Sequence, residues 1–138
     1  MKLTKNFTLE ELTYSETAQR NGINNCAYVD ILNNLTALCV NVLQPLRDHY
    51  NKPVVISSGY RCKKLNKLVG GVSNSQHLTG EAVDLVVLGV KLRDVYNYIK
   101  NNLPYDQLLF ETSKNGSWIH VSFTTNTNRH QAIDNYMA

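Results

Sequence analysis

Apolar residues recur at helical spacing along the first third of the chain. Between residues 27 and 50 they follow the period of a helix, and Pro45 inside this pattern predicts a kink or a restart. Two shorter helices are expected before it, because Thr8 and Glu11 have the spacing of a capping box and Ser15 is placed to cap the segment ETAQR. The N-terminal part of the chain is therefore predicted to be helical.

Beyond residue 50 the pattern changes to short apolar and β-branched runs. These runs predict four strands, over residues 53–57, 82–88, 107–111 and 118–123. The strongly apolar run at 82–88 is typical of a central strand, and the last two strands would form a hairpin around Asn115-Gly116.

Helical segments are expected between these strands. One or two turns are predicted over residues 61–68, a helix over residues 91–102, and a last turn in the polar tail, HQAIDNYM. Together these elements predict a single α+β domain over residues 1–138, with N-terminal helices packed on a small, mostly antiparallel sheet.

Composition narrows the class of protein. The chain has 138 residues, of which 43% are hydrophobic and 18% charged, as in a soluble globular domain. The net charge of +3 is too small and too scattered for a nucleic-acid binder, although it would favour an anionic surface such as a bacterial wall. No apolar run reaches the roughly 20 residues of a membrane span. We expect a monomer.

The cysteines and the N-terminus bear on the compartment. The chain has an odd number of cysteines, Cys26, Cys39 and Cys62, and no two of them have CxxC spacing. This favours a reducing compartment without a disulfide framework. The start, MKLTKNFTLEEL, lacks the apolar core of a signal peptide. A protein made in the cytoplasm would then need a separate release route to act outside it.

The predicted hairpin brings two polar side chains together. His120 falls on the polar face of the run WIHVSF, whose alternate residues form an apolar face. If Asn115-Gly116 are the central residues of a two-residue turn, Lys114 pairs with Ser117 and Glu111 pairs with His120. Directly paired side chains lie on one face, about 4.5–5.5 Å apart at Cβ. Glu111 and His120 are therefore predicted neighbours.

A second histidine and an acid complete a candidate metal site. Asp84 lies within the apolar run AVDLVV, where a carboxylate is costly unless it is paired or bound to a metal. Pairing with a buried arginine or with backbone N–H groups is the alternative. Asp84, His77 and His120 together make a His2Asp set. Catalytic zinc takes three such protein ligands and leaves one coordination position for water. Glu111 would be the general base.

Other polar residues near these motifs are candidates for substrate contacts. Arg61, in SSGYR, could bind a substrate carboxylate or the oxyanion of a tetrahedral intermediate, with an ion pair to an acid such as Asp84 as the equal alternative. Ser75 and Gln76 are candidates for substrate or supporting contacts, with turn or capping roles as alternatives. Trp118 would line the cleft or only pack. His130, in the polar tail, is interpreted as a surface histidine.

These motifs resemble a known family. The run S75-x-H77-x-x-G80-x-A82-x-D84, followed by W118-I119-H120, is similar to the zinc D-Ala-D-Ala carboxypeptidase family of the LAS metallopeptidases, which also include lysostaphin-type enzymes and the hedgehog signalling domain. The segments SSGYR and NFTLEEL resemble its short phage-type members. The resemblance implies a hedgehog/D-Ala-D-Ala peptidase-like fold, with His77, Asp84 and His120 as zinc ligands and Arg61 as a substrate or transition-state contact.

One departure from the family pattern concerns the catalytic acid. Many relatives carry it three residues before the last histidine, or carry a second histidine two before it, where this chain has Ser117 and Trp118. Glu111 must then act as the base.

Three functions remain open at this stage. The resemblance implies a zinc peptidase acting on peptidoglycan stem peptides, either as a D-Ala-D-Ala carboxypeptidase or as an endolysin-like L-Ala-D-Glu endopeptidase of phage or prophage origin. The alternative is a non-catalytic, zinc-containing module that binds the wall or serves as a virion structural part.

Overall fold

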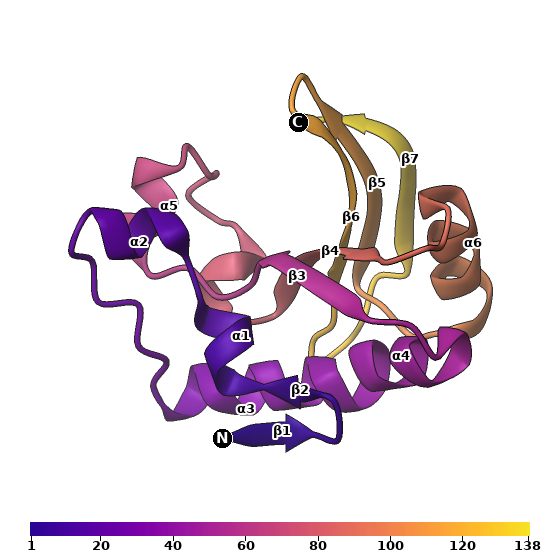
Figure 1. Ribbon diagram of the computed structural model, residues 1–138, viewed down its shortest axis with the longest axis horizontal. Coiled ribbons are helices and arrows are strands. Elements are labelled where there is room, and N and C mark those ends of the chain that lie inside the picture. The colour runs from indigo at the N-terminus through magenta and orange to yellow at the C-terminus, as the bar shows by residue number, and fades with distance from the viewer.

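The computed structural model describes residues 1–138, and its centre is a five-stranded sheet in the order β3-β4-β6-β5-β7 (Figure 1). Its strands are β3 (Val54–Ser58), β4 (Ala82–Val87), β5 (Gln107–Ser113), β6 (Gly116–Ser122) and β7 (Gln131–Met137). The short strands β1 (Lys2–Thr4) and β2 (Phe7–Thr8) form a separate pair. Only β5 and β7 are parallel, so the sheet is mostly antiparallel and the predicted α+β fold is confirmed.

Helices lie before the sheet and between its strands. They are α1 (Leu9–Thr13), α2 (Glu16–Arg20), α3 (Val29–Leu38), the π-helix η1 (Cys39–Leu43), α4 (Gln44–Tyr50), α5 (Lys63–Leu68), the 3-10 helix η2 (Gln76–Thr79) and α6 (Leu92–Asn102). One face of the sheet packs on α6 and on the α3–η1–α4 rod, and the shared core contains 22 buried residues. None of the helices combines the length and the apolar character needed to cross a membrane.

The helix ends follow the local sequence. Thr8 and Glu11 form the predicted capping box: the Thr8 hydroxyl accepts from the Glu11 amide, and the Glu11 carboxylate accepts from the Thr8 amide. Ser15 accepts from the Ala18 amide at the start of α2. The kink or restart predicted at Pro45 takes the form of the π-helical turn η1 directly before α4. The backbone stays right-handed helical at Leu43 and Gln44, so the helix changes its hydrogen-bonding pattern next to Pro45 instead of ending.

The hairpin register differs from the prediction by two positions. Ser113 pairs with Gly116 and Glu111 pairs with Trp118, so the predicted pairs of Lys114 with Ser117 and of Glu111 with His120 are wrong. The turn begins at Ser113, whose hydroxyl accepts from the Asn115 amide. A slip of two residues preserves the alternation of faces, so Glu111 and His120 still share a face.

The C-terminal tail is a strand rather than the predicted helical turn. β7 lies parallel to β5 at the edge of the sheet. Its residues are mostly exposed and polar, which hides the strand from hydrophobic periodicity. The hydrogen-bond partners of β7 are the free backbone groups at the edge of β5. This edge exists only in the folded sheet.

Candidate metal centre and active site

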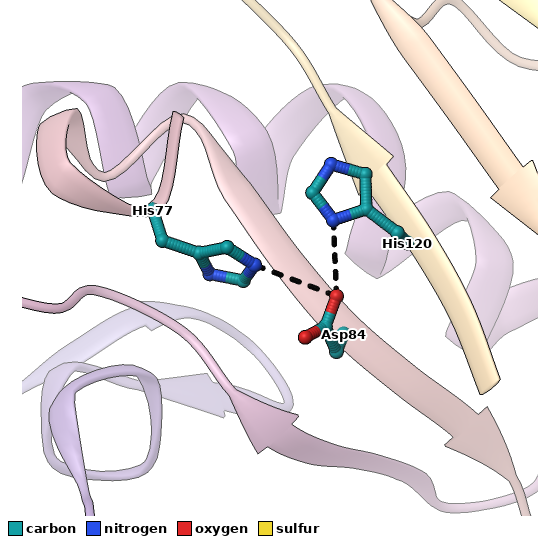
Figure 2. A group of neighbouring side chains, drawn as sticks. All are labelled: His77, Asp84 and His120. Atoms are coloured by element: carbon teal, nitrogen blue, oxygen red, sulfur yellow. Dashed lines mark hydrogen bonds and ion pairs between the residues drawn. The ribbon is translucent and has the colours of Figure 1, made fainter. Parts of the chain in front are cut away.

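Two adjacent strands and a short helix bring three side chains to one point. Asp84 on β4 is paired directly with His120 on β6, and His77 lies on η2. Oδ1 of Asp84 is 3.0 Å from Nδ1 of His120 and 3.4 Å from Nε2 of His77 (Figure 2). One ligand atom from each residue lies within 4.8 Å of the other two. The predicted His2Asp set is therefore assembled in the structure, in a form that could hold a metal ion.

The orientation of His77 is set by the chain around it. Its Nδ1 donates to the Gly59 carbonyl at 2.7 Å, which leaves Nε2 facing Asp84. Its own amide donates to the Ser75 hydroxyl, and its carbonyl accepts from the Arg61 amide. Such contacts behind a histidine select the tautomer and the ring orientation that a metal ligand requires.

Gly80 turns the chain from η2 into β4. It adopts a φ of +75°, which a side chain disfavours, and a Cβ there would lie 2.9 Å from Cγ2 of Ile31 and 3.2 Å from Cγ of Leu35. A glycine is required both by the backbone conformation and by the packing against α3. This turn sets the spacing between His77 and Asp84.

The carboxylate at the centre stays ionised. Burial alone would raise the pKa of Asp84, but hydrogen bonds from His120 and His77, with their charges, outweigh it and hold that pKa well below its usual value. Asp84 forms no ion pair with Arg61, so its partners are the two histidines. Two imidazole nitrogens and one carboxylate oxygen form a donor set that suits zinc.

Glu111 lies beside this cluster. Its Oε1 is 3.7 Å from Nδ1 of His120, across the strand boundary between β5 and β6. Burial raises the pKa of Glu111, and the charge of Asp84 raises it further. A carboxylate with a raised pKa next to a candidate metal centre has the property needed to accept and return a proton.

Arg61 lies on the wall of the same cleft. Burial lowers the pKa of its guanidinium, while Asp84 and Glu111 act in the opposite direction. It forms no salt bridge with either acid, and its Nε is buried without a hydrogen-bond partner. Arg61 therefore has hydrogen-bonding capacity that the fold leaves unused, on a side chain that lines the cleft.

The cleft around these residues has a volume of about 610 Å³. Ser75, Gln76 and Trp118 all line it. Ser75 also caps η2, and the Gln76 amide donates to Asp106 at 2.9 Å, so both support the loop that carries His77. Nε1 of Trp118 is buried without a partner.

Three further residues belong to this region although nothing in the sequence marks them. Asp106 is buried, and its carboxylate accepts from Nε and an NH2 nitrogen of Arg129 as well as from Gln76. The hydrogen bonds from Arg129 lower the pKa of Asp106 to about 2. Arg129 and Tyr136 line the cleft. None of the three has a local motif, since all depend on contacts between distant segments. His130, by contrast, is exposed and its ring lies 4.4 Å from that of Tyr105.

A His2Asp cluster with a carboxylate beside it, in an open cleft, is the kind of arrangement that hydrolytic metalloenzymes use. The family model described as Peptidase M15 matches residues 5–122, so the chain belongs to the peptidase M15 family and the resemblance seen in its motifs is confirmed. It is a hydrolytic metallopeptidase that acts on peptidoglycan-type peptide substrates. A search of curated proteins found no match.

Proposed function

We propose that this protein is a zinc-dependent peptidase that hydrolyses an amide bond of peptidoglycan stem peptides. His77, Asp84 and His120 are the zinc ligands, Glu111 is the general base, and Arg61 binds substrate. The observation that carries the proposal is the convergence of the three ligand atoms within 4.8 Å, with the Glu111 carboxylate 3.7 Å from one of them.

Each group has a separate task in this reaction. Zinc, when bound, supplies Lewis acidity that polarises the scissile carbonyl and makes water a better acid. Glu111 takes a proton from the attacking water and passes it to the leaving amine, a role that its raised pKa supports. Arg61 donates to the oxygen that gains negative charge in the transition state, or to a substrate carboxylate.

The shape of the surface favours an endopeptidase over a carboxypeptidase. A second groove of about 390 Å³ runs between β3 and the segment joining α1 to α2. Arg61 and Val69 line both this groove and the catalytic cleft, so the two hollows are neighbours on the surface. A stem peptide that occupies both would extend to either side of the scissile bond, as an L-Ala-D-Glu endopeptidase requires. Removal of a terminal D-Ala needs little room beyond that bond.

The site of action is the bacterial cell wall. The protein would reach it after release from the cell that makes it, as an endolysin of phage or prophage origin does. The moderate positive charge of +3 supports association with an anionic wall.

The test is mass spectrometry of purified muropeptides incubated with the zinc-loaded protein, with and without a chelator. Chelator-sensitive cleavage after L-Ala is the expected result, with Glu111→Gln as the inactive control. Loss of terminal D-Ala alone would identify a carboxypeptidase instead. Intact muropeptides beside a protein that retains one bound metal ion would contradict catalysis and identify the non-catalytic wall-binding or virion module.

A further inference from the structure

The segment beyond the family match contributes one wall of the cleft. β7 runs beside β5 at the sheet edge, and the C-terminus ends near the β5–β6 turn (Figure 1). Tyr136 on β7 is the direct partner of Glu111 on β5. Directly paired residues share a face of a sheet, so Tyr136 faces the same side as Glu111, and it lines the catalytic cleft.

Tyr136, Glu111 and Trp118 form a row across three neighbouring strands. Glu111 pairs with Trp118 on one side and with Tyr136 on the other. Since adjacent strands lie about 4.8 Å apart, an aromatic side chain stands on each side of the proposed general base. Tyr136 is 42% exposed, which leaves it accessible to a ligand in the cleft.

A regular strand would not place Tyr136 there. The pairing passes from Leu109 with Ile133 to Glu111 with Tyr136, so β7 advances by three residues where β5 advances by two. In a regular ladder Asn135 would face Glu111 and Tyr136 would point to the opposite face. One extra residue, taken up as a β-bulge, turns Tyr136 toward the cleft.

The bulge is supported from a helix. Arg93 on α6 donates two hydrogen bonds, of 2.7 and 2.9 Å, to the carboxylate of Asp134. That carboxylate also accepts from the Asn135 amide, and Asn135 adopts a φ of +54°, a left-handed conformation that asparagine tolerates better than most residues. The orientation of Tyr136 is therefore built into the fold by contacts between α6 and β7.

We propose that Tyr136 is a substrate-contacting residue of this peptidase. Its ring packs against the bound peptide on the side of Glu111 opposite Trp118, and its hydroxyl donates a hydrogen bond to a peptide carbonyl oxygen. Arg93, Asp134 and Asn135 are positioning residues that act through it. The inference rests on the proposed function for the identity of the substrate as a stem peptide.

The test measures binding separately from turnover. In the zinc-loaded Glu111→Gln background, the Kd of a purified stem peptide is determined by calorimetry and by the fluorescence of Trp118, the only tryptophan of the chain. Loss of one hydrogen bond in Tyr136→Phe should raise the Kd by roughly 2- to 12-fold, and Tyr136→Ala should raise it further. Tyr28→Ala is the matched control, because Tyr28 is 75% exposed and does not line the cleft.

A second pair of variants tests the bulge. Asn135→Gly keeps the left-handed conformation and should leave the Kd unchanged, whereas Asn135→Val opposes it and should raise the Kd as Tyr136→Ala does. In the active protein Asn135→Val and Tyr136→Ala should raise KM and Asn135→Gly should leave it unchanged, while metal content stays constant in all three.

The outcomes separate this inference from the proposed function. A stem peptide that binds Tyr136→Ala and the parent protein equally would overturn the role of Tyr136 and leave the proposed function standing. A parent protein that binds no stem peptide would overturn both.

Discussion

Glu111 and His120 lie on the same face of the sheet without being opposite each other. Glu111 is paired with Trp118 and His120 with Leu109, yet Oε1 of Glu111 comes within 3.7 Å of Nδ1 of His120. The diagonal arrangement leaves His120 directly paired with Asp84 on β4. One histidine therefore contacts both the central carboxylate of the candidate metal centre and the proposed general base.

This relationship predicts a separation of metal binding from turnover. Glu111→Gln retains the shape of the side chain but cannot accept a proton, so we expect the rate of stem-peptide hydrolysis to fall by roughly 10²- to 10⁴-fold. Zinc content, measured by atomic absorption, should not change. Asp94→Asn, at an exposed position on α6 that lines neither the catalytic cleft nor the second groove, is the control and should hydrolyse normally. Normal turnover in Glu111→Gln would remove Glu111 from the role of base.

Metal removal should destabilise the protein without unfolding it. Asp84 already contacts both histidines without a metal, through a hydrogen bond from Nδ1 of His120 and a 3.4 Å approach of Nε2 of His77, and the 22-residue core lies on the other face of the sheet. Zinc at 100 times its Kd should stabilise the fold by about 2.7 kcal/mol, measured as a rise in Tm. His77→Ala should abolish this rise and His130→Ala should preserve it. An equal rise in both variants would place the metal elsewhere.

Substitutions at Gly80 and Gly89 separate the cost of backbone strain from the cost of overpacking. Gly80 and Gly89 both have a φ of +75°, but only at Gly80 would an added Cβ meet other atoms within 4 Å. Gly89→Ala should lower the free energy of unfolding by about 1 kcal/mol through strain alone. Gly80→Ala adds overpacking against Ile31 and Leu35, so we expect a loss of about 2–4 kcal/mol, together with weaker zinc binding.

Denaturant titrations of both variants measure these losses. Equal losses at the two positions would show that the contact of Gly80 with α3 is unimportant.

The Asp106 network predicts a pH-dependent contribution to stability. Hydrogen bonds from Arg129 lower the pKa of Asp106 from 3.8 to about 2 in the folded protein. Because the pKa of Asp106 is lower in the folded state, the unfolded state binds the proton more readily. The stabilisation is therefore present above the unfolded pKa and is lost as the pH falls toward the folded pKa. The free energy of unfolding of the wild type should exceed that of Asp106→Asn at about pH 6. The difference should shrink between about pH 4 and pH 2.

Chemical denaturation of both proteins across this range provides the measurement. The difference between the free energies of unfolding of the two proteins removes the contribution of other carboxylates whose pKa the fold lowers, such as Asp84 and Asp134, because both proteins contain them. A difference that stays constant down to pH 2 would show that the ion pair with Arg129 does not stabilise the fold.

The sequence by itself determined the local features and the identity of the central cluster. The helix caps, the helix irregularity next to Pro45 and the strand at residues 82–88 depend on neighbours within a few positions. A carboxylate inside an apolar strand indicates a partner whatever the remaining fold. The alternation of side chains also placed Glu111 and His120 on one face of the sheet. A register error of two residues does not change which face a side chain points to.

The tertiary structure decided what depends on distant partners. The hairpin register follows from a hydrogen bond of Ser113 inside the turn, and β7 exists because the edge of β5 offers backbone partners that no local pattern encodes. Arg129 holds Asp106 from a distant segment, and Arg93 on α6 binds Asp134, two residues before Tyr136, so both positions depend on contacts that are remote in the sequence. Local propensity is a weak prior in such places, because long-range hydrogen bonds and burial contribute more free energy than the residues' own preferences.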